Sequence, residues 1–487
     1  MTLVHHILPR TPVRSLDEYR AQGGGRGLET ARGVEREAIV REVEASGLRG
    51  RGGAGFPTGR KWRAVRDYRS ARWPASVVVN AAEGEPGSFK DRTILRSNPY
   101  QVLEGALIAA QAVEADKVIV GLKRSFRAEV RRVGEAVEEV RRAGWSEGVE
   151  LVVFEGPEAY LFGEETALLE AIDGRDPFPR LAPPYRRGVD ELVETQADVG
   201  SSLPAHVLMA GDDALAPPTL VDNVETVANV PRIVADGASW FRMSGTAESP
   251  GTVVCTITGH TQRHGVGEVM MGTPLHEVIE ATGGAPQPGD NIAAVLPGAS
   301  NPPIPGDQLD VPVSYEGLAA IGSGLGSAAF MVLDDTADLV AAVAGVSRFL
   351  AVESCGQCTA CKRDGLSLSS LLAKLCRSQA DESDLADLHQ LVGTVTDGAR
   401  CSLAAEHQAV VAGLLERFPA AVRAHVDHEA SRVEPDDIAA LVGIEGDVAV
   451  LDERRRSKQP DWTFDQAWSG ATPANRLADH RTHIERD

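Results

Sequence analysis

Four cysteines are the residues best suited to chemistry in this chain. Cys355, Cys358 and Cys361 make a C-x2-C-x2-C run, and Cys401 follows 40 positions later. Three thiolates on one tight loop and a fourth from a distant segment suit a [4Fe-4S] cluster, because each iron of the cubane takes one thiolate. Structural zinc is the alternative, but it usually draws on two C-x2-C pairs, and Cys401 has no such neighbour. The spacing therefore favours an iron-sulfur cluster over zinc.

The other two cysteines, Cys255 and Cys376, lie in apolar stretches of an expected strand and an expected helix. A free cysteine in such a place usually behaves as a small core hydrophobe. Six cysteines, most of them clustered, are also too few for a disulfide scaffold in 487 residues. We expect Cys255 and Cys376 to be structural.

A glycine-rich loop forms a second group. Residues 48–62 read L-R-G-R-G-G-A-G-F-P-T-G-R-K-W. The glycines allow close backbone approach and positive φ, the N–H groups can cradle phosphate, and Arg51 and Lys61 add charge. The loop lacks the G-x4-G-K-S/T spacing and follows no expected strand. The interleaved Arg, Phe and Trp disfavour a flexible linker, so we interpret it as a nucleotide-phosphate loop.

Two acidic loops follow expected strands. Residues 80–92 read N-A-A-E-G-E-P-G-S-F-K-D-R, and residues 163–166 read G-E-E-T. Open α/β sheets bind ligands in loops at the carboxyl ends of their parallel strands. Glu164 and Glu165 also stand at a helix start, where the macrodipole favours acids, so helix capping is the alternative role.

The elements that must position these loops alternate along the first part of the chain. Helices are expected at 35–46, through Trp62 and Tyr68, from Asn98 and Pro99, and from Ser125, with strands at 77–79, 117–121 and 151–154. This alternation predicts an open, mostly parallel α/β sheet. From about 180 to 218, Pro, Gly and acidic residues indicate a long surface insertion or linker.

The later part of the chain changes character twice. Residues 250–333 are rich in Gly, Pro, Val and Thr, and a strand at 252–258 and a helix at 275–281 predict a small mixed domain. Apolar faces then recur at helical spacing, which predicts a four-helix unit with the cysteine run at its first loop. Those faces fall at 338–350, 366–376, 384–395 and 407–416. The tail after His425 is charged, and we expect its run Arg454–Arg456 to be a solvated face.

Composition limits the class of protein. The length predicts two to four domains, and 43% apolar with 24% charged residues is typical of globular proteins. No apolar run approaches the roughly 20 residues that a bilayer crossing needs, and the N-terminus lacks signal-peptide features. We therefore expect a cytoplasmic protein. A net charge of −21 argues against a general nucleic-acid binder.

Taken together, these motifs resemble the flavoprotein subunit of respiratory complex I and the diaphorase subunits of NAD-linked hydrogenases and formate dehydrogenases. The resemblance runs from about residue 40 to 425. Besides the glycine and acidic loops, it includes G-E-E-T-A-L at 163–168, N-V-E-T at 223–226, E-S-C-G-x-C-x-x-C at 353–361 and the late Cys401. Several long motifs in one order make a chance match very improbable.

The resemblance implies an architecture of four parts. Residues 1–245 would form a Rossmann-like FMN/NADH-binding α/β domain with an insertion at about 186–216. Residues 246–334 would form a small ubiquitin-like α+β domain, and residues 335–425 a helical [4Fe-4S]-binding domain. Residues 426–487 would be a charged C-terminal extension.

The resemblance also assigns roles to residues. Glu85, Glu165 and Phe56 would face NADH, with Phe56 stacking on the adenine. FMN would be held by Gly50, Arg51, Gly52, Lys61, Asn80, Glu83, Gly163, Glu164, Asn223 and Thr226. Gly53 and Gly55 belong to the same cofactor loop, and Tyr185 keeps a ring in the segment that usually reads K-P-P-F. The four cysteines would hold the cluster.

Several positions depart from the family's pattern. Ala82 replaces an Asp near the flavin, Ala64 replaces an aromatic residue of the adenine stack, and Ala182 replaces a cation. Asp222 stands for an Asn, where a negative charge pointing inward would oppose a flavin phosphate. Beside the cluster, Ala360 and Lys362 replace Pro and Arg but leave the four ligands intact.

Two main functional hypotheses follow. In the first, the chain is an NADH dehydrogenase subunit that passes hydride from NADH to FMN and electrons through the cluster to a [2Fe-2S] thioredoxin-like partner subunit. Such a module would act in the cytoplasm, at the inner face of the membrane through its partners. In the second, a divergent relative keeps fold and cluster as an electron relay or scaffold with weak or no NADH oxidation. A zinc-stabilised interaction protein is a third, poorly supported alternative.

Overall fold

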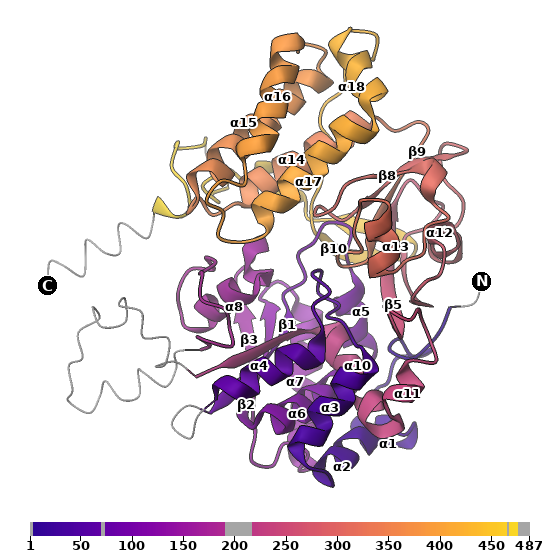
Figure 1. The fold of residues 1–487 in the computed structure, drawn as a ribbon, viewed down its shortest axis with the longest axis vertical. Helices are drawn as coiled ribbons and strands as arrows, with labels where there is room; N and C mark the ends of the chain where they lie inside the picture. Colours follow the sequence, from indigo (N-terminus) through magenta and orange to yellow (C-terminus); the bar gives the residue numbers. More distant parts are fainter. Residues whose placement is uncertain (1–2, 70–73, 190–216, 465–466, 476–487) are drawn as a thin grey trace, which may run out of the picture.

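A four-stranded parallel sheet lies at the centre of the first half of the molecule (Figure 1). The computed structural model describes residues 3–69, 74–189, 217–464 and 467–475. The sheet has the order β3-β2-β1-β4. Its strands are β1 (Ala75–Ala81), β2 (Ala115–Lys123), β3 (Glu150–Gly156) and β4 (Thr219–Asn223). The predicted open parallel α/β sheet is confirmed, although β4 was not predicted.

The two faces of this sheet bury alternate side chains, as a period of two requires. Val77 and Val79 of β1 point into the larger core. Val78 points into a smaller core beneath α8 (Glu165–Ile172). The larger core is built with α1 (Leu16–Ala21), α2 (Arg26–Arg32), α3 (Arg36–Ser46), α4 (Thr58–Tyr68), α6 (Pro99–Val113), α7 (Arg127–Arg142) and α10 (Val224–Asp236). The sheet is therefore covered on both sides.

Local sequence signals set the ends of these helices. Asn98 caps α6 by accepting a hydrogen bond from the Gln101 N–H, and Pro99 fills the first helical position. Gly47, at φ +70°, ends α3 just before the glycine-rich loop. Among the described residues, this half also contains three short elements: α5 (Lys90–Ser97), the 3-10 helix η1 (Tyr160–Gly163) and α11 (Ala238–Phe241).

A second, mixed sheet has five strands in the order β6-β5-β9-β7-β8. They are β5 (Thr252–Gly259), β6 (Gly265–Met270), β7 (Ile292–Pro297), β8 (Ile304–Pro305) and β9 (Ala329–Asp334), with helices α12 (Leu275–Gly283) and α13 (Tyr315–Ala320). The central pair β5 and β9 is parallel and the other pairs are antiparallel. This is the strand order of a ubiquitin-like fold. Cys255 of β5 is fully buried in its core.

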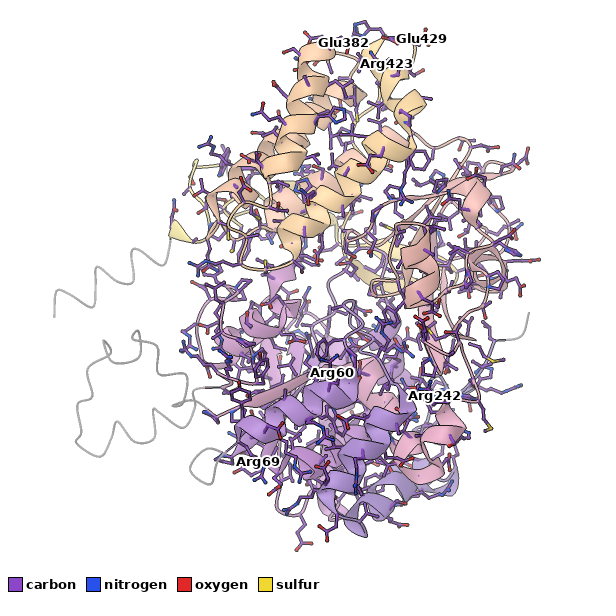
Figure 2. The ribbon with its side chains drawn as sticks, in the orientation of Figure 1. Arg60, Arg69, Arg242, Glu382, Arg423 and Glu429 are labelled. Carbon is purple, nitrogen blue, oxygen red and sulfur yellow. The ribbon has the colours of Figure 1, made fainter. Side chains whose placement is uncertain are left out.

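The last large unit is helical and forms the upper part of Figure 1. Its helices are α14 (Leu339–Glu353), α15 (Thr359–Cys376), α16 (Glu382–Thr394), α17 (Leu403–Arg417) and α18 (Pro419–Val426). The four predicted helices are present, and Pro419 starts an additional short one. At the outer end of the unit, Arg423 of α18 pairs with Glu382 of α16 (Figure 2). Cys376 is fully buried in the helical core.

The C-terminal extension contains the hairpin β10 (Leu441–Glu445) and β11 (Val448–Leu451) and the 3-10 helix η4 (Glu453–Ser457). The expectation that Arg454–Arg456 is a solvated face is wrong for Arg455, which is 9% exposed and pairs with the buried Glu353. The sequence could not indicate this, because the partner lies about a hundred positions away.

The predicted insertion at about 186–216 lies mostly outside the described residues. The domain boundaries near 245, 334 and 425 stay predictions. Among the helices of the described ranges, none has both the length and the apolar character that crossing a membrane requires.

Candidate functional site

The strand order of the parallel sheet reverses between β1 and β4. Open α/β sheets bind ligands in the crevice beyond the carboxyl ends of their strands at such a switch point. Asn80 of β1 and Asn223 of β4 are register partners at this edge. The structure thus brings together two residues that the sequence separates by more than a hundred positions.

The glycine-rich loop lies over this edge. The loop is closed by the Gly50 N–H, which donates to the Phe56 carbonyl at 2.8 Å. Its Arg51 N–H donates to Oγ1 of Thr226 on α10 at 2.8 Å. A Cβ on Gly52 would lie 3.2 Å from Cβ of Asn223, so only a residue without a side chain packs comfortably there. The loop and the start of α10 therefore form one surface.

The side chain of Arg51 is buried but incompletely paired. Its Nη2 donates to the Pro250 carbonyl at 3.1 Å. Its Nε and Nη1 are buried without a hydrogen-bond partner in the described part of the chain. A buried guanidinium with unused donors calls for an anionic acceptor. Gly53 beside it has φ +136° and open space where a Cβ would stand. These residues fit the phosphate of FMN.

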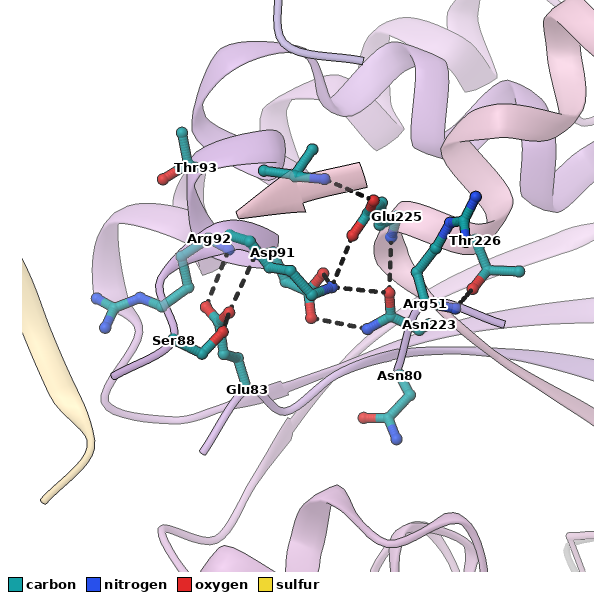
Figure 3. A network of polar contacts seen from close by, with 12 residues as sticks. Arg51, Asn80, Glu83, Ser88, Asp91, Arg92, Thr93, Asn223, Glu225 and Thr226 are labelled. Carbon is teal, nitrogen blue, oxygen red and sulfur yellow. Dashed lines mark hydrogen bonds and ion pairs between the residues drawn. The ribbon is translucent and has the colours of Figure 1, made fainter. Parts of the chain in front are cut away.

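A buried polar network lies beside the switch point and fixes its side chains (Figure 3). The Lys90 ammonium lies 2.7 Å from Oδ1 of Asp91, 3.2 Å from Oδ1 of Asn223 and 3.1 Å from Oε2 of Glu225. Asn223 also donates through Nδ2 to Asp91 at 2.7 Å. Burial alone would lower the pKa of Lys90. The carboxylates of Asp91 and Glu225 outweigh this effect, so the pKa of Lys90 is raised. Asn223 is thereby held in one orientation.

Glu83 organises the loop after β1. Its carboxylate accepts hydrogen bonds from Oγ of Ser88 at 2.6 Å, the Asp91 N–H at 3.1 Å and the Arg92 N–H at 3.3 Å (Figure 3). It therefore sits at the start of α5, where the helix dipole favours a negative charge. Burial raises the pKa of Glu83 and the neighbouring Asp91 raises it further.

The ammonium group of Lys61, on α4, lies at the end of β4 in the parallel sheet. It pairs with Glu165, donates to the Val221 carbonyl at 2.6 Å and lies 4.0 Å from Asp222. Burial alone would lower the pKa of Lys61. The carboxylates of Glu165 and Asp222 outweigh this effect, so the pKa of Lys61 is raised. Asp222 accepts a hydrogen bond from Nε1 of Trp62 at 2.7 Å. The charge of this atypical residue is therefore compensated within the protein.

The loop at 163–166 joins the same edge. Nδ2 of Asn80 donates to the Gly163 carbonyl at 2.8 Å. Glu164 caps α8, because its carboxylate accepts from the N–H groups of Thr166 and Ala167 at 3.0 and 2.8 Å. Burial raises the pKa of Glu164. The capping role considered from the sequence is present, and it leaves one carboxylate oxygen without a role in the cap.

Glu85, in the loop after β1, faces the second sheet. It accepts hydrogen bonds from the Tyr160 hydroxyl and the Ala299 N–H, both at 2.7 Å. Burial raises the pKa of Glu85, while these hydrogen bonds oppose the shift. A Cβ on Gly298 would lie 2.3 Å from Oε1 of Glu85. The second sheet therefore reaches the edge of the first and fixes this carboxylate.

Two contacts of aromatic rings lie beside α4, one with a guanidinium and one with another ring. Phe56 is 50% exposed, and the guanidinium of Arg60 lies 5.8 Å from its ring centre. Arg60 itself lies near the start of α4 (Figure 2). The ring of Tyr185 lies 5.2 Å from that of Tyr68, which is 51% exposed. Tyr68 follows Ala64 by one helical turn. Exposed rings of this kind can stack on a planar ligand.

The four motif cysteines lie where three helix ends meet. Cys355 follows the end of α14, Cys358 and Cys361 stand at the start of α15, and Cys401 precedes α17. Gly356 takes φ +86° in the turn between them. The positive ends of the α15 and α17 dipoles therefore point toward the thiols, which favours an anionic group such as an iron-sulfur cluster with four thiolates.

All four cysteines line one pocket, which is also bordered by Leu161 and Pro179. Burial raises the pKa of Cys361 and of Cys401 to about 12, so a bound metal must displace the protons. In the described ranges, no three His, Cys, Asp or Glu side chains converge on a point that could hold a single ion. A cubane takes one thiolate per iron, so its ligands need not converge. The four thiols around this pocket therefore supply the number and type of ligands that a [4Fe-4S] cluster needs.

Lys362 and Glu353 brace the cysteine loop. Nζ of Lys362 donates to three carbonyls at the end of α14: Ala351 at 3.0 Å, Val352 at 3.3 Å and Ser354 at 2.9 Å. The carboxylate of Glu353 accepts from the Tyr160 N–H at 3.1 Å. Because the Tyr160 hydroxyl binds Glu85, a continuous chain of contacts links the flavin side to the cysteine loop.

Sequence reasoning missed several of these residues. Lys90, Asp91 and Glu225 stand inside the quoted motifs, so their position in those motifs could have indicated a role. Glu353 likewise opens the quoted motif at 353–361, whereas Tyr160 carried no signal of its own, because it acts through partners from other elements.

Two family models match the chain. Residues 43–232 match the Nuo51 FMN-binding domain, and residues 341–425 match the NADH-ubiquinone oxidoreductase-F iron-sulfur binding region. The first range contains the switch point with its glycine-rich loop. The second contains the four cysteines.

Complete proteins are similar as well. An NADH-quinone oxidoreductase F subunit of Rhizobium meliloti, the form numbered 2, is 36% identical over 423 residues, which cover 85% of this chain and 94% of that protein. The NADH-quinone oxidoreductase F subunit of Streptomyces coelicolor is 37% identical over 398 residues, covering 80% and 83%. Among solved structures, an NAD+-reducing [NiFe]-hydrogenase in the H2-reduced state matches with a TM-score of 0.72 and 29% identity, covering all of this chain and 72% of the other.

Proposed function

Because the chain belongs to the family of NADH-quinone oxidoreductase F subunits, we propose that it passes hydride from NADH to FMN and single electrons onward through a [4Fe-4S] cluster. Two observations together support this proposal. Arg51 at the switch point has buried donors without a partner, and a pocket lined by four cysteines is connected to the switch point through Tyr160 and Glu353. The resemblance seen in the sequence is confirmed, as are the FMN and [4Fe-4S] cofactors it implied.

We assign the FMN phosphate to the glycine-rich loop. The free donors of Arg51 and the N–H groups of Gly52 and Gly53 would supply hydrogen bonds there. Thr226 holds the loop in place by accepting a hydrogen bond from the Arg51 N–H, and Asn223 packs against Gly52. FMN, when bound, accepts two electrons together and releases them singly. The role of the protein is to orient the cofactor and exclude competing reactions.

We assign NADH to the side of Glu85, Glu165 and Phe56. The exposed Phe56 ring offers a stacking surface for adenine. Glu85, fixed by Tyr160 and Ala299, offers a carboxylate acceptor of defined position. Tyr68 beside Tyr185 presents aromatic surface one turn beyond Ala64, where the family's ring is missing. These residues position the substrate and need not exchange protons with it.

As a member of this family, the chain works within a multi-subunit complex. We propose that electrons leave the cluster for a [2Fe-2S] thioredoxin-like partner subunit, because the chain's motifs supply cysteines for one cluster only. We also propose that the complex acts in the cytoplasm, at the inner face of the membrane through other subunits.

The test is anaerobic addition of NADH to protein reconstituted with FMN and cluster. We expect the flavin's visible band to bleach and the reduced cluster to appear by electron paramagnetic resonance. The matched control is Cys401→Ala, in which the flavin should still bleach but the cluster signal should be lost. Cys255→Ala, at a buried cysteine that does not line the cysteine pocket, should behave as the unchanged protein.

Two results would overturn the proposal. Flavin that binds but stays oxidised under NADH would make the chain an electron relay. A cluster that forms in protein unable to bind FMN would make it a scaffold, as Ala64, Ala82 and Ala182 would then indicate.

A further inference from the structure

The C-terminal extension returns to the cysteine loop after leaving the helical unit. Beyond α18, the Val433 N–H donates to the Cys376 carbonyl and the Asp436 N–H to the Ala341 carbonyl, both at 3.0 Å. The extension thus runs back along α15 and α14. We call its described final part, residues 452–464 and 467–475, the C-terminal strap. It lies beyond residue 425, where the match to the iron-sulfur family ends.

The C-terminal strap is anchored on a buried carboxylate. Glu353, 1% exposed, ends α14 two residues before Cys355. Nζ of Lys458 lies 2.8 and 2.7 Å from its two oxygens, and Arg455 pairs with it as well. Lys458 is 4% exposed. A buried charge is tolerated only when it is paired and hydrogen-bonded, so α14 and the strap depend on each other here.

Two further contacts reach the cysteine loop itself. Nε1 of Trp462 donates to the Val352 carbonyl at 2.9 Å, and the Ala474 N–H donates to the Cys355 carbonyl at 2.8 Å. A Cβ on Gly356 would lie 2.5 Å from Cβ of Thr472. The ring of Trp462 also lies 5.7 Å from that of Phe178. The strap therefore packs directly on the backbone of the first cysteine.

These contacts complement those made from inside the unit. Lys362 binds the carbonyls of Ala351, Val352 and Ser354, whereas the strap binds those of Val352 and Cys355. The backbone from the end of α14 to Cys355 is thus held from two sides. A ligand whose backbone is fixed loses less freedom on binding metal and is released more slowly.

We propose, building on the cluster of the proposed function, that the C-terminal strap is a positioning element that holds Cys355 as a ligand and so slows loss of the iron-sulfur cluster. Lys458 and Arg455 secure the strap on Glu353, and the Ala474 N–H is its direct tie to the ligand residue. Nothing in this role depends on NADH oxidation.

The test compares Ala474→Pro, which removes the N–H donor, with Ala474→Ser, which keeps it. Full-length protein carrying the reconstituted cluster is exposed anaerobically to excess EDTA, and the loss of the cluster's visible absorbance is followed. We expect Ala474→Pro to lose its cluster about threefold to tenfold faster, the effect of one lost hydrogen bond. Ala474→Ser should match the unchanged protein.

A second variant ends the chain after residue 470, which removes Thr472 and Ala474 but keeps the Lys458 anchor. We expect faster cluster loss, a shifted paramagnetic resonance spectrum of the reduced cluster, and an unchanged far-UV circular dichroism spectrum. Equal loss rates and identical spectra in all variants would overturn the strap's role. Failure of the unchanged protein to take up any cluster would instead overturn the proposed function.

Discussion

Asp222 is the residue whose departure from the family pattern has the clearest physical consequence. Burial raises its pKa to about 6, against the opposing effects of Lys61 and Trp62. The folded protein therefore keeps a proton that the unfolded chain loses near pH 4. Since the folded state then binds more protons, stability falls as the pH rises from about 4 to 6 and stays low above it.

Asp222→Asn should remove this dependence while keeping an acceptor for Trp62. We expect the variant to be more stable than the parent by about 3 kcal/mol at pH 7.5, with the difference shrinking toward pH 4.5. Urea unfolding of the cofactor-free protein across this range measures it. A constant difference at all pH values would contradict the assignment of the titrating group.

A substitution of Phe56 should change the affinity for NADH without changing the stability of the fold, because half of the side chain is exposed. We expect Phe56→Ala to raise KM for NADH by about threefold to tenfold, the usual range for a lost aromatic stack. Its free energy of unfolding should change by less than about 0.5 kcal/mol, as for most surface substitutions. Phe56→Tyr, which keeps the ring, is the matched control. An unchanged KM would remove Phe56 from the NADH site.

At the scale of the element, α8 carries a residue with two candidate roles. Glu164 caps the helix through Thr166 and Ala167, and the family resemblance also places it beside FMN. Glu164→Ala should lower stability by about 1 kcal/mol, the usual cost of a lost cap. Glu164→Asp should restore the cap, because Asp is a good capping residue, yet still bind FMN more weakly if the carboxylate must reach the cofactor. Chemical denaturation and fluorescence titration with FMN separate the roles, and normal FMN affinity in Glu164→Asp would leave capping alone.

Most elements that position the site could be predicted from the sequence, and the reason is local. Asn98 and Pro99 predicted the start of α6, and the apolar spacing predicted α14 to α17. The strand β4 escaped prediction because it has only five residues and follows a long stretch rich in Pro and Gly. Short strands are specified by their neighbours in the sheet more than by their own sequence.

The contacts that complete the site could not be predicted, because they form between residues that lie far apart in the sequence. Glu353 meets Tyr160 and Lys458 only after three distant segments have packed together. The glycine-rich loop could be identified by its composition, but its seat on Asn223 and Thr226 depends on the strand order. The cysteine run was the simplest case, because three ligands lie within one loop.

At the scale of the whole molecule, the parallel-sheet unit, which we call the flavin half, and the helical unit, which we call the helical half, have separate cores. One bridge between them is hydrophobic. Leu161 and Phe178 leave the flavin half and are buried in the helical core. The hydrogen bond from Tyr160 to Glu353 lies at the same junction. Each half therefore has enough buried apolar surface to unfold as a unit, while the bridge couples the two.

Cofactor loading should reveal this arrangement as two thermal transitions. A ligand that binds only the folded state stabilises it by about 2.7 kcal/mol at a hundred times its Kd. Excess FMN should therefore raise the midpoint of the flavin half, and removal of the cluster by chelation should lower that of the helical half, whose cysteine loop would lose its metal. Differential scanning calorimetry of the four loading states measures both. Because the bridge couples the two halves, FMN should also raise the helical midpoint by a smaller amount in the unchanged protein, and Leu161→Ala should abolish that smaller shift. A single transition that shifts equally with either cofactor would mean that the two halves unfold together.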